Sequence, residues 1–80
     1  MKKIKTVYDK IQDLLEDLQD IVAELEEKRD AIEERADSKG RDMTDKEQER
    51  YDNLDTEISD IEESISELEN AQYSLEDYID

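Results

Sequence analysis

Apolar residues recur every seven residues along the first half of the chain, in three series that run side by side. The three series are Ile4, Ile11, Leu18, Leu25 and Ile32; Val7, Leu14 and Ile21; and Tyr8, Leu15 and Val22. In heptad notation they occupy positions a, d and e, which together form a stripe about 100° wide along one side of an α-helix. This spacing predicts a long amphipathic helix, because strands alternate with a period of two.

The second half of the chain carries one apolar series whose steps alternate between three and four residues, with a gap at Ala71 and Gln72. Its members are Tyr51, Leu54, Ile58, Ile61, Ile65, Leu68, Leu75 and Ile79. No Pro or Gly interrupts either half of the pattern, so the sequence predicts a second long helix.

The predicted connection lies around the single glycine of the chain, Gly40. Glycine can adopt the left-handed conformation that ends many helices, and Thr44 followed by Glu47 has the spacing of a capping box that begins one. We therefore expect one helix over residues 4–37, a loop over 38–43 and a second helix over 44–79.

The two helices match each other when the chain is folded back at this loop. Partners in an antiparallel hairpin have residue numbers with a constant sum, and here that sum is 79 or 80. The pairs are Leu25 with Leu54, Val22 with Ile58, Leu18 with Ile61, Leu15 with Ile65, Ile11 with Leu68, Tyr8 with Ala71 and Ile4 with Leu75. Arg29 and Tyr51 fall in the same register, which predicts a cation–π contact. The fold class expected is all-α, a single antiparallel two-helix coiled-coil hairpin over residues 1–80.

One apolar series is left over after this pairing. A two-helix coiled coil needs only two apolar positions in seven, and the hairpin register uses positions a and e of the first helix. Val7, Leu14 and Ile21 at position d therefore predict a dimer interface and a four-helix bundle. The alternative is a monomer that curls over an apolar stripe of ordinary width.

The composition excludes several classes of function. The 80 residues include no Cys and no His, so the chain can form neither a thiolate site nor the Glu-x-x-His ligand set of helical di-iron proteins. The loop is no calcium site, because Lys39 and Arg41 occupy positions where the ion needs oxygen ligands. We expect no enzymatic activity, no cofactor and no bound metal.

The same composition bears on location and on partners. No apolar run approaches the roughly 18 residues that a membrane span needs, and no hydrophobic segment of a secretory signal follows the basic N-terminus. We therefore expect a cytoplasmic protein. The net charge of −16 opposes direct binding to nucleic acid or to an anionic membrane.

The acidic residues are concentrated between the two ends of the predicted hairpin. Residues 11–27 and 52–69 together contain 15 carboxylates and no basic residue. On two antiparallel segments that are each about 25 Å long, this gives one negative charge per about 1.7 Å, close to the value for duplex DNA. We call these 15 acidic residues the acidic belt. The belt residues predicted to contact a partner are Asp13, Asp17, Asp20, Glu24, Asp55, Glu57, Asp60, Glu62 and Glu63. The alternative is an acidic surface that is merely solvated.

Part of the chain resembles a known family. Gly40-Arg41-Asp42-Met43-Thr44, followed by Glu47, Arg50, Tyr51 and Leu54, is similar to the turn in the N-terminal delta domain of tailed-phage major capsid proteins. That resemblance implies a coiled-coil scaffolding element. The whole chain also looks like the short acidic helical accessory proteins that phages encode, some of which block host defence by imitating nucleic acid.

These observations favour a non-catalytic binding protein, with three hypotheses for its role. The first is a phage-encoded inhibitor, of the anti-CRISPR or anti-restriction type, whose acidic belt occupies a nucleic-acid-binding groove on a basic host protein in the cytoplasm of an infected bacterium. The second is a coiled-coil assembly or scaffolding module of a phage. The third is an antitoxin-like protein that masks a basic toxin. An inhibitor depends on the acids, whereas a scaffold depends on Val7, Leu14 and Ile21.

Overall fold

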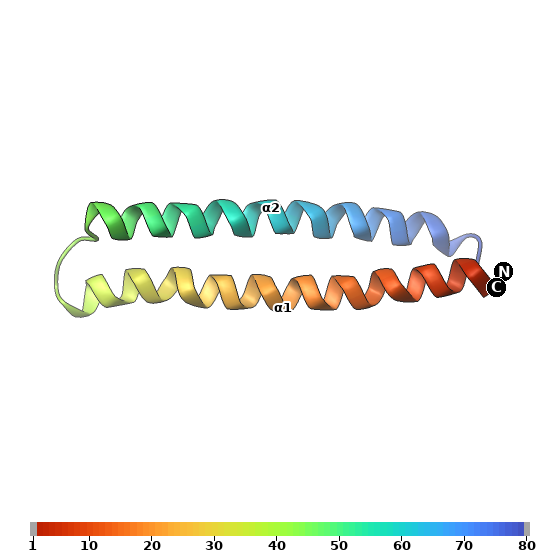
Figure 1. The fold of residues 1–80 in the computed structure, drawn as a ribbon, viewed down its shortest axis with the longest axis horizontal. Helices are drawn as coiled ribbons and strands as arrows, with labels where there is room; N and C mark the ends of the chain where they lie inside the picture. Colours follow the sequence, from red (N-terminus) through yellow and green to blue (C-terminus); the bar gives the residue numbers. More distant parts are fainter. Residues whose placement is uncertain (1, 80) are drawn as a thin grey trace.

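Two long helices lie antiparallel and side by side, joined at one end by a short loop (Figure 1). The computed structural model describes residues 2–79, and the side chains of residues 3–79. Helix α1 spans Lys2–Ser38 and helix α2 spans Asp45–Glu76. The rod measures 59 × 15 × 13 Å, and the start of α1 and the end of α2 lie at the end opposite the loop. The predicted all-α hairpin is confirmed.

The helix bounds differ from the predicted ones chiefly at the C-terminal end, where α2 stops three residues before Ile79. The last turn of α2 has no basic residue, and the acidic side chains of Glu76 and Asp77 are unfavourable at the negative end of the helix dipole. The chain leaves the helix in a turn in which the N–H of Asp77 bonds to the carbonyl of Leu75. Ile79 is nevertheless half-buried.

The predicted glycine is the second residue of the loop. Gly40 has a φ of 65°, and its N–H donates to the carbonyl of Asp37 at 3.0 Å. The next N–H, of Arg41, reaches back to the carbonyl of Ala36 at 3.2 Å. This pair of bonds is a Schellman motif, which satisfies carbonyls that the end of α1 would otherwise leave unpaired.

The predicted capping box begins α2. The N–H of Glu47 donates to Thr44 Oγ1 at 3.1 Å, and the N–H of Thr44 donates to Glu47 Oε1 at 2.9 Å. Arg41 reinforces the box, because Nη1 donates to Glu47 Oε1 at 2.7 Å and to the Asp42 carbonyl at 2.9 Å, while Nη2 donates to Glu47 Oε2 at 3.4 Å. The Arg41 guanidinium and the Thr44 backbone N–H lower the pKa of Glu47 from 4.5 to about 2.

The apolar core of the hairpin is thin. The only buried apolar residues among those described are Leu15, Val22, Ala36 and Ile58. Leu15, Val22 and Ala36 share position e of α1, so this position faces α2 most directly. The position-a residues of α1 and the remaining members of the apolar series in the second half of the chain are half-buried. This is expected where two helices cover only one side of each other.

The register of the hairpin differs from the predicted one. Tyr8 Oη donates to Glu76 Oε1, Gln72 Nε2 to Gln12 Oε1 and Arg29 Nη1 to Asp55 Oδ1. The numbers of these partners add to 84, whereas the cation–π partners Arg29 and Tyr51, 5.9 Å apart, add to 80 as predicted.

The helices therefore mesh about a point between positions 40 and 42, which lies nearer the middle of the observed connection. Tyr8 therefore donates a hydrogen bond to Glu76 and does not pack against Ala71 as predicted; Ala71 is exposed. Gln72 takes the half-buried place in the gap of the apolar series, because its amide can pair with that of Gln12.

Candidate interaction surfaces

The acidic belt is exposed along its whole length. All nine residues predicted to contact a partner are exposed, four of them on α1 and five on α2. Eight of them have no ion-pair partner within residues 2–79. Asp55 is the exception, because Arg29 of the other helix binds it at 2.9 Å; the Asp55 side chain is still 60 % exposed, and its contact with a partner stays a prediction.

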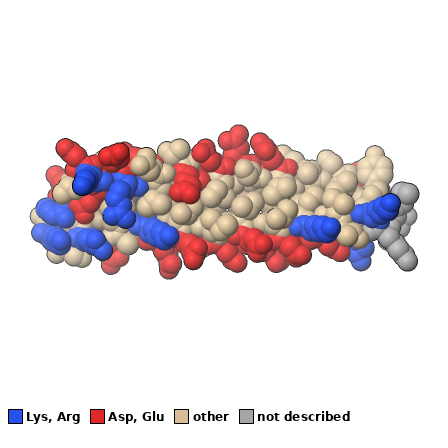
Figure 2. Space-filling model, in the orientation of Figure 1, with Lys and Arg blue, Asp and Glu red and all other residues tan. Residues whose placement is uncertain are grey.

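These acids do not form one continuous patch. On the face drawn in Figure 2, acidic side chains gather along the two outer edges of the rod, and a largely uncharged band lies between them over the middle of the rod. Asp55 and Glu62 belong to the other side of α2, since Asp55 meets Arg29 and Glu62 lines a groove with Gln19 and Glu26. A partner that engaged the belt would therefore have to reach around the rod or to choose one edge.

The leftover apolar series is exposed, as its heptad position predicts. Val7 is 49 % exposed, Leu14 51 % and Ile21 41 %. We define the stripe face as the side of the hairpin that carries this series. The cross-helix bonds of Tyr8 and Gln12 lie on the opposite side, at positions e and b of the heptad. The two sides of the hairpin thus differ, one bridged by polar side chains and the other offering apolar ones.

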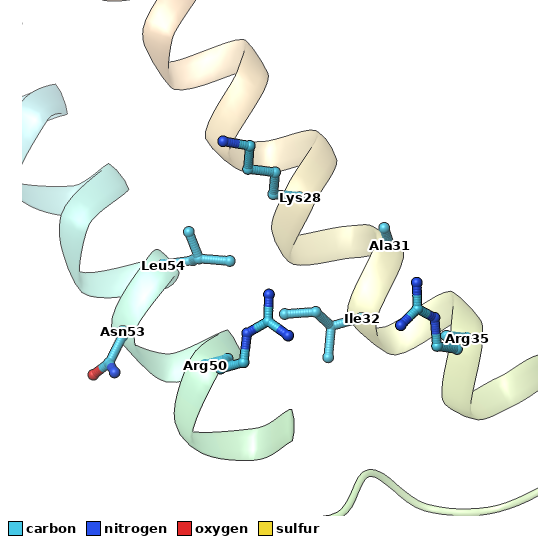
Figure 3. A pocket seen from close by; sticks show the side chains of 7 residues that line it. All are labelled: Lys28, Ala31, Ile32, Arg35, Arg50, Asn53 and Leu54. Carbon is cyan, nitrogen blue, oxygen red and sulfur yellow. The ribbon is translucent and has the colours of Figure 1, made fainter. Parts of the chain in front are cut away.

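Towards the loop, the stripe face becomes basic. Counting on by sevens from Ile21 leads to Lys28 and Arg35, and these two line an open groove with Arg50 (Figure 3). Ile32 and Leu54 point into the space between the helices at this groove, and Ala31 and Asn53 complete its lining. None of the three cations has an ion-pair partner within the described part of the chain. Lys28 and Arg35 continue the seven-residue spacing of the stripe, so the sequence already contains the signal for this basic groove.

The described residues contain no group of three or more His, Cys, Asp or Glu side chains placed to hold a metal ion. Within residues 2–79, neither helix combines the length and the apolar character that crossing a bilayer demands.

By its fold, the chain is a two-helix antiparallel hairpin with one apolar and one polar side. No protein-family model, no curated protein and no solved structure matches it. Its function must therefore be argued from the surfaces themselves.

Proposed function

We propose that this chain is a non-catalytic binding protein that competes with nucleic acid for a basic groove on another protein. The single observation that carries this proposal is the exposed acidic belt, in which eight of the nine predicted contact residues have no ion-pair partner within residues 2–79. Crowded like charges destabilise a folded chain, and interleaved Lys residues would have relieved that cost through i,i+4 pairs.

The geometry of the rod supports this role. The belt occupies the middle of a rod 59 Å long, and hydrogen bonds order the end of α1 and the start of α2 on either side of the loop. A binding surface that is already ordered loses little conformational entropy on association. Dense negative charge also accelerates the encounter with a basic partner and makes the association rate fall steeply with salt. The proposed setting is the cytoplasm of a bacterial host, where the target is a nuclease or a defence effector.

The test is a gel-shift competition in which the protein displaces labelled DNA from purified host nucleases and defence effectors. The belt variant reverses four unpaired acids of α2 to Lys, namely Glu57, Asp60, Glu62 and Glu63. Asp55 is left intact because its bond to Arg29 joins the helices. The belt variant should lose at least tenfold in competing strength, since removing charges from a charged interface typically costs more than 1.4 kcal/mol in total.

A control variant with the same net charge separates the belt from bulk charge. It reverses four acids outside the belt to Lys, namely Glu33, Glu34, Asp37 and Asp77. Circular dichroism should show that both variants remain helical, because the substituted positions are exposed. The proposal fails if the belt variant competes as strongly as the wild-type protein, or if the control variant loses as much as the belt variant.

A second role, assembly through coiled-coil pairing, is favoured by a different observation. Three large apolar side chains spaced by seven residues, Val7, Leu14 and Ile21, each expose more than two fifths of their surface. A regular exposed apolar series on a helix is typical of a surface that packs against another helix. The assembly role rests on apolar residues and the competing role on acidic ones, so one chain can have both.

A further inference from the structure

We infer that two copies of this chain pair through their stripe faces, with the two α1 helices antiparallel about a two-fold axis that passes beside Leu14. The inference deepens the assembly role and makes no use of the acidic belt as a binding site for another protein. It begins with the residues that border the stripe on the outer edge of α1.

Those border residues occupy heptad position g, four residues before each stripe residue or three after it. They are Lys3, Lys10, Asp17 and Glu24. All four are exposed, and Figure 2 shows basic side chains near the chain ends and acidic ones along the middle of that edge. The edge is thus divided by charge, with two cations before Leu14 and two anions after it.

This division makes the edge complementary to itself when it is reversed. In an antiparallel pair centred on Leu14, Val7 lies against Ile21 of the second copy and Leu14 lies against its own counterpart. In the same register Lys10 faces Asp17 of the second copy, and Lys3 faces its Glu24. Residues at g of antiparallel coiled-coil helices flank the apolar seam, where opposite charges select orientation and register. Both the apolar and the charged residues therefore fit one arrangement.

Other arrangements of the same surfaces conflict with the charges. A parallel pair would set each g residue beside an e residue of the second copy, and the e residues Leu15 and Val22 are buried within the hairpin, so Lys10 and Asp17 would gain no opposite charge. An antiparallel pair that overlaps one heptad further, centred on Ile21, sets Leu14 and Val7 against Lys28 and Arg35. That overlap would bury the cations of the basic groove without partners, which costs free energy. The staggered pair leaves both loop ends, with their basic grooves, projecting in opposite directions.

One row of helix α2 presents small uncharged residues level with the apolar stripe. Arg50 lies on the stripe face because it lines the basic groove with Lys28 and Arg35, and counting on by sevens from it leads through Glu57 to Ser64 and Ala71. Ser64 and Ala71 are exposed and lie level with the apolar part of the stripe. Ala71, which interrupts the apolar series of the hairpin, is small enough to let a second copy approach closely.

Disulfide trapping tests the register directly, because the chain has no Cys of its own. Leu14→Cys lies beside the proposed axis and should form a covalent dimer on mild oxidation at low protein concentration. Val7→Cys alone and Ile21→Cys alone should not, since like positions are about 21 Å apart in this register and a disulfide spans under about 7 Å between Cα atoms. Mixing these two variants should give the mixed dimer.

Charge exchange tests the border residues independently. Lys10→Glu and Asp17→Lys should each weaken dimerisation by roughly tenfold, because each change turns two exposed attractive pairs into repulsive ones. The double variant should recover most of the loss. Lys5→Glu and Glu16→Lys make the same changes in net charge on the far side of α1 and should alter dimerisation by less than threefold. Sedimentation equilibrium measures all five.

The inference is overturned if the wild-type protein sediments as a monomer at 100-fold the concentration used for trapping, or if Val7→Cys links to itself as readily as Leu14→Cys. It is also overturned if the double exchange fails to restore dimerisation. These outcomes leave the gel-shift competition unaffected, so failure of the pairing and failure of the inhibitory role are distinguishable.

Discussion

Replacing Gly40 by alanine should weaken the hairpin through backbone strain alone. Gly40 has a φ of 65°, and a Cβ added there meets no atom within 4 Å. The cost therefore contains no steric clash with the surroundings and reduces to the left-handed conformation, which costs an L-residue about 1–2 kcal/mol. Alanine also restricts the unfolded chain, which returns about 0.4–1 kcal/mol.

The net loss expected in the free energy of unfolding is about 1 kcal/mol. For a domain of this size that corresponds to a fall in Tm of about 4–8 °C. The assay is thermal unfolding followed by far-UV circular dichroism, at one fixed protein concentration so that any self-association is held constant. Gly40→Asn is the matched control, because asparagine tolerates the left-handed conformation better than alanine does.

Two results would refute this reasoning. A Gly40→Ala variant that melts within 1 °C of the wild type would show that the Schellman motif does not constrain the end of α1. A Gly40→Asn variant that melts at as low a temperature as Gly40→Ala would show that the loss of stability does not come from the positive φ at this position.

Three further predictions concern charge and the turn. Thr44→Ala should lower the free energy of unfolding by about 1 kcal/mol through loss of the N-cap, measured by urea titration. Glu47 has a pKa lowered to about 2 by Arg41 and Thr44, so its contribution is complete above its unfolded value of 4.5 and is lost as pH falls through about 2. The stability difference between wild type and Glu47→Gln should accordingly shrink between those two pH values, and a constant difference would contradict the assigned bonds. Tm should rise with added NaCl, because a chain of net charge −16 repels itself; a flat or falling Tm would show that ion pairs outweigh repulsion.

The hairpin could be predicted because its signals are local. A seven-residue repeat fixes the buried side of each helix, and the capping box of Thr44 and Glu47 fixes where α2 begins. The Arg29–Tyr51 contact was also within reach, because the Arg29 side chain meets Tyr51 as well as Asp55, which lies one helical turn further along α2. The predicted C-terminal end of α2 was wrong, because the apolar series continues to Ile79 whereas the acidic last turn disfavours the helix beyond Glu76.

The register and the site were harder to predict, because both depend on polar side chains meeting across the helices. The constant-sum pairing used apolar residues only and so gave no place to the amide pair of Gln12 and Gln72. The same omission hid the bond from Arg29 to Asp55, which no pattern within α2 could show. Lys28 and Arg35 carried a visible signal, since their spacing continues that of the stripe.

The two proposed roles compete for a few residues, and this overlap makes them separable. Asp17 and Glu24 belong to the acidic belt, yet the inferred pairing engages both with lysines of the second copy. The acids left for a basic partner are then Asp13, Asp20, Glu57, Asp60, Glu62 and Glu63. Asp17→Asn should therefore weaken dimerisation several-fold, since it removes one attractive pair on each side of the axis. At concentrations where it is still dimeric, this variant should compete with DNA as well as the wild type. Asp20→Asn should instead weaken competition with DNA and leave dimerisation unchanged. If Asp17→Asn weakened competition as much as Asp20→Asn does, Asp17 would be free to contact a partner, which the pairing forbids.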